Sequence, residues 1–248
     1  MIQRKYLRGL LNLLNDNNCK MKKKKGVNSK IKAVIFDIGG VLQLTDYIKV
    51  RGKLSRKVCE HSTGTHEYIS RKLGLDLDTW FDSIDTAYAK SIEGEISDKK
   101  AVMIIAKNLR IGYSKLHKLF IDAYNRQFKK NKKLYDFSHH LKKEGYIVGI
   151  LSDQWALSAE ALISKKDRKG FDPVIVSNEV GFRKPDVHIY RLLMKELRKI
   201  EKGIKYSEVL FIDNRDWNTK PAEKLGMKAI LFKDNKQCLK ELKGFGVL

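Results

Sequence analysis

The fold is decided by one stretch of the sequence, Ala33-Val34-Ile35-Phe36-Asp37-Ile38-Gly39-Gly40-Val41-Leu42. Four apolar residues run directly into a carboxylate, and the two glycines that follow permit a tight turn. A continuous apolar run bounded by glycine is typical of a strand buried on both faces. Asp37 is therefore expected at the carboxyl end of a central strand, where open α/β sheets bind ligands. Taken alone, this aspartate is explained equally well as a cap on the next turn.

Three later apolar runs also end in polar residues, at Ser152-Asp153, Ser177-Asn178 and Asp213-Asn214. Segments with helical periodicity separate these runs, and strands that alternate with helices form a parallel, doubly wound sheet. The carboxyl ends of parallel strands share one edge, so these polar residues are expected to converge with Asp37. Lys184 stands at the start of a helix. Carboxylates, a hydroxyl and a lysine near helix N-termini suit phosphate chemistry.

The composition bounds the class of protein. The chain has 248 residues, of which 42% are hydrophobic, enough for one large domain or two modest ones. Its three cysteines are scattered, which suits a reducing compartment and predicts a cytoplasmic protein rather than a disulfide framework. We find no apolar run of the length that a membrane span requires.

The chain is strongly basic, since 51 basic and 29 acidic residues give a net charge of +22. Residues 1–30 hold nine of the basic residues and one acidic residue, and are interpreted as a flexible basic extension. The remaining charge is spread along the chain, whereas a nucleic-acid site gathers it on one face. We therefore expect no specific nucleic-acid partner.

The periodicity divides the rest of the chain into two domains. Residues 31–44 and 131–248 are expected to form the α/β core, and residues 45–130 an all-helical insert. Within the insert, Asp78, Ser97 and Ser114 stand where helix N-caps are expected.

These motifs together resemble the haloacid dehalogenase-like (HAD) superfamily, in particular its phosphatase branch with a helical cap after the first strand. The resemblance covers about residues 31–245. It rests on Phe36-Asp37-Ile38-Gly39-Gly40-Val41-Leu42, Gly149-Ile150-Leu151-Ser152-Asp153, Gly181-Phe182-Arg183-Lys184-Pro185-Asp186 and Phe211-Ile212-Asp213-Asn214. One motif alone is weak, but four in the family's order with a helical insert at the family's cap position are specific.

The resemblance implies a magnesium-dependent phosphatase of small phosphorylated metabolites that works through an aspartyl-phosphate on Asp37. It implies that Ser152 and Lys184 are catalytic with Asp37. Phosphate-binding residues would be Gly39, Gly40, Ser152, Asp153 and Lys184. Magnesium would be held by Asp37, the Gly39 carbonyl, Asp213 and Asn214. The oligomeric state is left open.

Two departures from the family pattern keep alternatives open. Relatives usually carry a general acid at the position of Gly39 and a second aspartate at the position of Asn214. A metal-independent 2-haloacid dehalogenase lacks the same groups, and Trp217 resembles a tryptophan found there. A degenerate binding module is a third reading.

Other candidate residues are weaker. Cys59, His61 and His66 lack a fourth ligand at zinc-like spacing and are interpreted as surface residues. Trp155 and Trp217 follow two strand ends, so each either lines the site or packs in the core.

Overall fold

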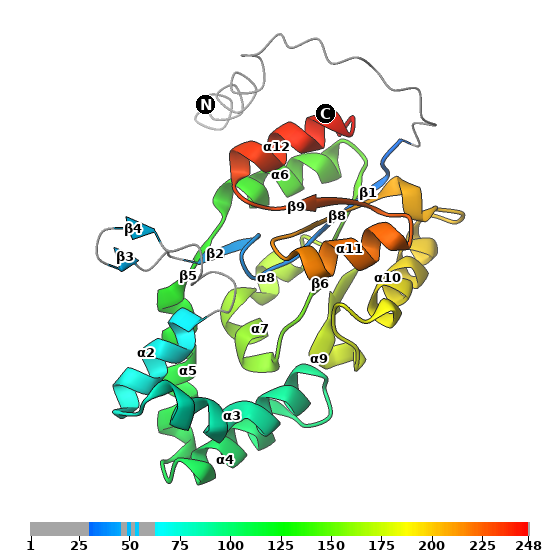
Figure 1. The fold of residues 1–248 in the computed structure, drawn as a ribbon. Coiled ribbons are helices and arrows are strands. Elements are labelled where there is room, and N and C mark those ends of the chain that lie inside the picture. Colours follow the sequence, from blue (N-terminus) through cyan, green and yellow to red (C-terminus); the bar gives the residue numbers. More distant parts are fainter. Residues whose placement is uncertain (1–29, 46–48, 51–52, 55–62, 248) are drawn as a thin grey trace.

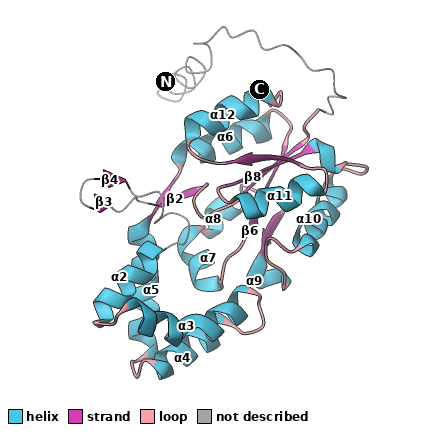
Figure 2. Cartoon of the chain, in the orientation of Figure 1, coloured by secondary structure: helices cyan, strands magenta, loops and turns pink. Residues whose placement is uncertain are grey.

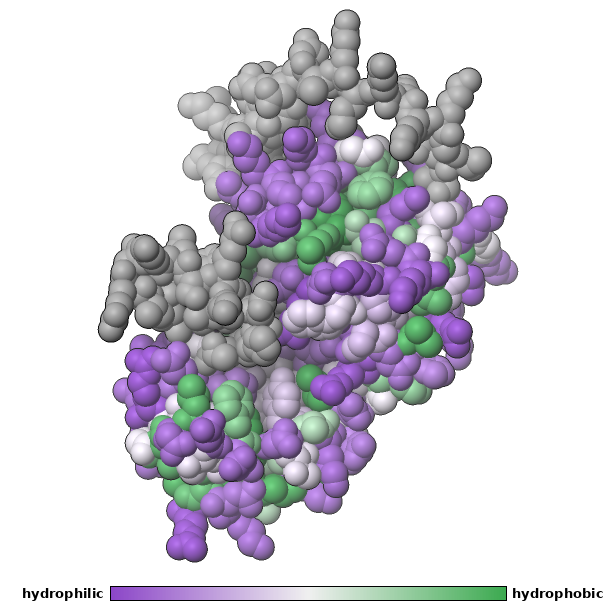
Figure 3. All heavy atoms as spheres, in the orientation of Figure 1, coloured by the Kyte–Doolittle hydropathy of each residue, from purple (hydrophilic) through white to green (hydrophobic). Residues whose placement is uncertain are grey.

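The computed structural model describes residues 30–45, 49–50, 53–54 and 63–247 (Figure 1). The predicted basic extension over residues 1–30 therefore lies outside the described residues apart from Lys30, as do Cys19, Cys59 and His61. Among the described residues, no helix is both long enough and apolar enough to cross a membrane. On the face seen in Figure 3, hydrophilic residues lie on both the core and the insert, with apolar areas between them, rather than in one stripe.

The core is a parallel five-stranded sheet, which confirms the predicted fold class. Its strand order is β7 (Val174–Val176), β6 (Ile147–Ser152), β1 (Ala33–Phe36), β8 (Val209–Asp213) and β9 (Lys228–Leu231). In the central strand, Ile35 pairs with Gly149 on one side and with Phe211 on the other. All four residues of β1 are buried, as a strand covered on both faces requires.

Helices cover both faces of the sheet (Figures 1 and 2). Val34 and Phe36 belong to the hydrophobic core that α6 (Lys132–Lys143) and α12 (Asn235–Gly244) complete. Ala33 and Ile35 point the other way, into a second core completed by α10 (Val187–Ile200) and α11 (Asp216–Lys224). Alternate residues of one strand therefore serve two cores, which makes the sheet doubly wound.

A helical insert follows the first strand and lies at the bottom of Figure 1. It consists of α2 (Thr63–Leu73), α3 (Leu77–Ile92), α4 (Asp98–Asn108) and α5 (Tyr113–Gln127). Ser97 caps α4 as predicted. The predictions for the neighbouring helices were wrong, because Asp76 rather than Asp78 accepts the Thr79 N–H, and Gly112 rather than Ser114 precedes α5.

A short antiparallel ribbon joins the helical insert to the core. Strand β2 (Gln43–Thr45) leaves the core and pairs with β5 (Phe128–Lys130), which returns to it. The remaining short elements are β3 (Lys49–Val50), β4 (Lys53–Leu54), α7 (Ala156–Leu162), α8 (Lys165–Arg168), α9 (Ser177–Val180) and the 3-10 helix η2 (Tyr206–Glu208). The ribbon places the insert over the carboxyl edge of the sheet, where the predicted site residues lie.

Candidate active site

Asp37 directly follows β1 and is 6% exposed. Its backbone N–H donates to the Ile212 carbonyl, so the strand pairing that builds the sheet also fixes this residue. The chain then turns at Gly40, whose φ of +85° is one that L side chains rarely adopt. The turn opens the Asp37 carboxylate to a cavity of about 550 Å³.

Ser152 lies behind Asp37 at the end of β6. Its Oγ donates to Asp37 Oδ1 at 2.7 Å and accepts from Gln154 Nε2 at 3.0 Å. The Ile38 N–H also reaches this hydroxyl, at 3.4 Å. Two donors therefore occupy the hydroxyl oxygen and its proton points at Asp37. Ser152 is fully buried and does not itself line the cavity.

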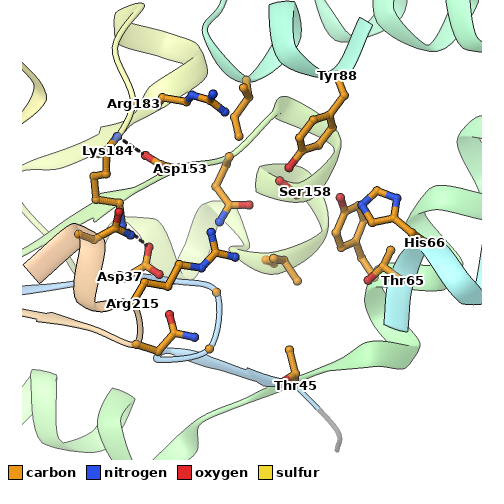
Figure 4. A pocket seen from close by; sticks show the side chains of 18 of the residues that line it. Asp37, Thr45, Thr65, His66, Tyr88, Asp153, Ser158, Arg183, Lys184 and Arg215 are labelled. Carbon is orange, nitrogen blue, oxygen red and sulfur yellow. Dashed lines mark hydrogen bonds and ion pairs between the residues drawn. The ribbon is translucent and has the colours of Figure 1, made fainter. Parts of the chain in front are cut away.

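Lys184 joins the ends of three strands, and Figure 4 shows it beside Asp37 and Asp153. Its Nζ donates to Asp37 Oδ1 at 3.0 Å, to Asp213 Oδ2 at 2.6 Å and to the Leu151 carbonyl at 3.2 Å. Burial alone lowers the pKa of this lysine, but the carboxylates of Asp213, Asp37 and Asp153 outweigh burial and hold the pKa above its ordinary value. The ammonium group is therefore charged and all three of its N–H bonds are used.

Asp213 has both carboxylate oxygens occupied by protein donors. Oδ1 accepts the Arg215 N–H at 2.8 Å, Oδ2 accepts Lys184, and Asn218 Nδ2 bridges both oxygens at 3.2 and 3.0 Å. Burial raises the pKa of Asp213, while Lys184 and the Arg215 N–H oppose this rise and favour the ionised carboxylate. In this arrangement Asp213 anchors Lys184 and is turned away from the cavity, which it does not line.

Asn214, the next residue, faces the opposite way and lines the cavity. Its Oδ1 is buried and has no hydrogen-bond partner. The side chain packs against Gly40 so closely that a Cβ on Gly40 would lie 2.7 Å from Asn214 Cγ. A buried amide oxygen without a donor is a ligand that a hard cation accepts. Asp37, the Gly39 carbonyl and Asn214 are thus the groups present that fit magnesium. Among the described residues, no cluster of three or more His, Cys, Asp or Glu side chains is arranged to hold a metal.

The cavity also contains charged residues that the sequence analysis did not single out for this role. Arg183 and Arg215 line it beside Asp153, whose Oδ1 accepts the Lys184 N–H at 2.9 Å and whose pKa is raised by burial. Arg183 Nε lies 3.1 Å from Glu93 Oε1 at the end of α3, which links core and helical insert. A sequence signal existed for Arg183 and Arg215, because each is adjacent to a predicted site residue.

The helical insert supplies the other wall of the cavity. Its lining residues include Thr65, His66, Phe81, Tyr88 and Tyr124. The interpretation of His66 as a surface residue was wrong, since it is 8% exposed and its Nδ1 accepts the Trp80 indole N–H at 3.0 Å.

The two tryptophans have different places. Trp155 is 1% exposed and packs in the core, where its indole N–H donates to the Tyr124 hydroxyl. Trp217 is 44% exposed and lines the cavity.

The predicted site residues are thus brought together, with Asp37, Gly39, Gly40, Asp153, Lys184 and Asn214 at the cavity and Ser152 and Asp213 behind it.

Among curated relatives, this chain is 26% identical to the bifunctional epoxide hydrolase 2 of Sus scrofa over 86% of its own length. It spans 38% of the length of that relative. It is also 33% identical to the glyceraldehyde 3-phosphate phosphatase of Methanocaldococcus jannaschii, over 35% of this chain and 37% of that protein.

Solved structures share the fold. A HAD-like hydrolase from Porphyromonas gingivalis superposes with a TM-score of 0.65 and 17% identity, over 87% of this chain and 98% of that one. A HAD family enzyme from Bacteroides thetaiotaomicron, in complex with magnesium and inorganic phosphate, superposes with a TM-score of 0.60 and 20% identity. The match covers 83% of this chain and 96% of that one. The model of the haloacid dehalogenase-like hydrolase family matches residues 31–226. The chain therefore belongs to the haloacid dehalogenase-like hydrolases.

Proposed function

We propose that this hydrolase is a magnesium-dependent phosphatase of small phosphorylated metabolites and that Asp37 is its nucleophile. One observation carries the proposal. Ser152 and Lys184 both bind Oδ1 of Asp37, so neither of these two donors occupies Oδ2 of this carboxylate, which lines the cavity. A carboxylate held rigidly at the end of a buried strand, with one oxygen tied and one open, is suited to attack an electrophile.

The reaction balances with groups present in the cavity. Asp37 attacks phosphorus, the bond from phosphorus to the ester oxygen breaks, and an aspartyl-phosphate forms. Water then attacks phosphorus, inorganic phosphate leaves and the carboxylate is restored. The main obstacle is repulsion between an anionic nucleophile and an anionic substrate, and Lys184 offsets it together with Arg215 and Arg183.

The leaving group receives little help from this chain. Members of the HAD phosphatase branch usually carry a general acid at the position where this chain has Gly39. General acid catalysis contributes roughly two to four decades in rate. The alkoxide therefore takes its proton from water, and substrates with acidic leaving groups should react fastest.

Magnesium fits beside Asp37. Asp37, the Gly39 carbonyl and the unpartnered Asn214 Oδ1 would hold it, with substrate oxygens and waters completing the shell. When bound, the ion supplies positive charge next to the transferring phosphoryl group. Asp213, expected above as a ligand, already has its oxygens bonded to Lys184, Asn218 and the Arg215 N–H, so we assign it to anchoring Lys184. A solved relative from B. thetaiotaomicron contains magnesium and inorganic phosphate, which supports the proposal that a magnesium ion binds in this chain.

We further propose that residues 45–130 act as a cap that closes over the substrate, while residues 31–44 and 131–248 form the catalytic core. The Glu93–Arg183 ion pair and the β2–β5 ribbon are the contacts through which such a cap would close.

The test is release of inorganic phosphate from a panel of phosphorylated metabolites, with magnesium and with a chelator, by the wild type and by Asp37→Asn. We expect magnesium-dependent turnover that Asp37→Asn abolishes, and fluoroaluminate trapped against Asp37 in the wild type. Substantial activity in Asp37→Asn, or an anion trapped elsewhere, would refute the mechanism.

A second candidate is a metal-independent 2-haloacid dehalogenase. It is favoured by the direct pairing of Lys184 with Asp37, which gives the nucleophile a cationic partner without a metal. Halide release from 2-chloropropionate in the presence of a chelator would establish it, and absence of halide release would exclude it.

A further inference from the structure

The cavity has two chemically different ends (Figure 4). At the core end, Lys184, Arg183 and Arg215 provide positive charge around Asp37. At the insert end, the buried lining residues that the structure describes are uncharged. Of the described residues that the insert contributes to the lining, Asp85 is the only charged one, and it is exposed to solvent. The cavity therefore suits a substrate with an anionic group at the core end and a neutral group at the insert end.

His66 is a neutral donor at the insert end. The Trp80 indole can only donate, so the N–H it directs at His66 Nδ1, at 3.0 Å, requires that nitrogen to be unprotonated. The ring proton therefore sits on Nε2. Burial lowers the pKa of His66 to about 4, so the ring carries no charge at neutral pH. Among the lining residues that the structure describes, the insert end thus offers the His66 N–H and no cation.

Aromatic rings surround this donor. The ring centroids of Phe81 and Tyr88 lie 5.3 and 6.1 Å from that of His66. Phe81 is 38% exposed although it is a large apolar residue, and it lines the cavity. Aromatic rings that line a cavity beside a polar donor favour a flat ligand that packs on them and accepts one hydrogen bond.

The volume of the cavity and the charge of its lining further limit which ligands fit. A cavity of about 550 Å³ is in the range of small-molecule sites, and a three-carbon phosphate ester would leave much of it to water. A second anionic group at the insert end would be buried without a cationic partner among the described lining residues, which is costly. We propose that the cavity selects phosphate monoesters of flat, uncharged aromatic or heteroaromatic alcohols, whose ring packs against Phe81 and Tyr88 beside the His66 Nε2–H. This inference rests on the proposed phosphatase function.

The test must separate ring recognition from leaving-group reactivity, because Gly39 makes this enzyme sensitive to the latter. We therefore choose alkyl-alcohol esters throughout: 2-naphthylmethyl phosphate, cyclohexylmethyl phosphate, glycerol 3-phosphate and 3-phosphoglycerate. We expect kcat/KM for the naphthylmethyl ester to exceed that for glycerol 3-phosphate at least tenfold, mainly through KM. The saturated ring should fall between them, and 3-phosphoglycerate, with its second anion, should be the poorest. Equal kcat/KM values, or a preference for 3-phosphoglycerate, would overturn the inference.

A matched pair of variants on α3 assigns the effect to the cavity wall. Phe81→Ala should bring the naphthylmethyl-to-glycerol ratio of kcat/KM close to one. Leu77→Ala is the control, because Leu77 is 37% exposed on the same helix and does not line the cavity. It should leave the ratio unchanged. A ratio that survives Phe81→Ala would contradict the proposal.

A binding measurement distinguishes failure of this inference from failure of the proposed function. Calorimetry with 2-naphthylmethylphosphonate and methylphosphonate needs no turnover. Tighter binding of the naphthylmethyl compound without any phosphatase activity would refute the function and uphold the ring preference. Phosphatase activity with no difference in affinity would uphold the function and refute the ring preference.

Discussion

The ammonium group of Lys184 lies 2.6 Å from Oδ2 of Asp213, and both side chains are almost completely buried. Burying two charges costs desolvation free energy, which is offset only while each charge keeps its hydrogen-bonded partners. Lys184 has a second carboxylate, Asp37, at 3.0 Å, so one buried cation serves two buried anions. Removing the cation is therefore far worse than removing one anion.

This asymmetry predicts an order of stabilities. Lys184→Met leaves Asp37 and Asp213 without a cation and should lower the free energy of unfolding by about 3–5 kcal/mol. Asp213→Asn leaves Lys184 paired with Asp37 and should cost less. The double variant, measured by urea denaturation, should be more stable than Lys184→Met alone. A double variant less stable than either single one would show that the pairing is not the controlling interaction.

The glycine turn after Asp37 gives a second prediction. A Cβ on Gly40 would lie 2.7 Å from Asn214 Cγ, and the φ of +85° is itself strained for an L residue by roughly 1–2 kcal/mol. Gly40→Ala should lower both stability and activity. At Gly39 a Cβ meets nothing within 4 Å, so Gly39→Ala should stay within about 0.5 kcal/mol of wild type in unfolding. Equal losses of stability in the two variants would contradict the structure of this turn.

The sequence predicted the core because its signals there are local. Each strand of the sheet ends near a polar residue, and apolar runs separated by helical periodicity leave one class of fold. The β2–β5 ribbon was missed, since its strands have three residues each and Phe128-Lys129-Lys130 continues the helical pattern of α5. Strands this short have no periodicity to detect.

The division of labour within the site was also not visible in the sequence. Adjacent residues at a strand end point in opposite directions, so Asp213 turns to Lys184 while Asn214 turns to Gly40. The spacing of the motif predicts the same location for both residues and does not separate their roles. Asn218 was missed because its hydrogen bonds to Asp213 depend on where α11 begins. The burial of His66 likewise depends on tertiary packing against Trp80.

A third prediction concerns the missing general acid. Because nothing lies within 4 Å of a Cβ at Gly39, Gly39→Asp has room to place a carboxyl group at the cavity. The rate advantage of aryl over alkyl phosphates should shrink by roughly tenfold or more. Gly39→Asn is the control, since an amide of the same size cannot supply the proton and should keep the gap. An unchanged ratio in Gly39→Asp would mean that the new acid does not reach the leaving oxygen.

A fourth prediction concerns metal affinity. Asn214→Asp replaces a neutral, unpartnered oxygen with a charged one, and hard cations bind charged oxygen more strongly. The magnesium concentration for half-maximal binding, measured by calorimetry without substrate, should fall at least tenfold. Asn178 also has a buried, unpartnered Oδ1 but does not line the cavity, so Asn178→Asp should leave the magnesium titration unchanged. An equal response of both variants would show a general charge effect instead of a site.

The last prediction follows from the neutral state of His66. Burial lowers its pKa to about 4 in the folded protein, whereas in the unfolded chain it is near 6.5. As the pH falls from about 6.5 to 4, the unfolded chain takes up a proton that the folded protein does not, so stability is lost across this window. The full difference corresponds to about 3 kcal/mol. In His66→Gln, an amide oxygen can still accept the Trp80 N–H but does not titrate. The free energy of unfolding of the wild type should therefore fall between pH 7 and pH 4 by up to that amount more than that of His66→Gln. Parallel pH profiles for the two proteins would mean that His66 takes up a proton as readily in the folded protein as in the unfolded chain, which would contradict the lowered pKa assigned to the buried ring.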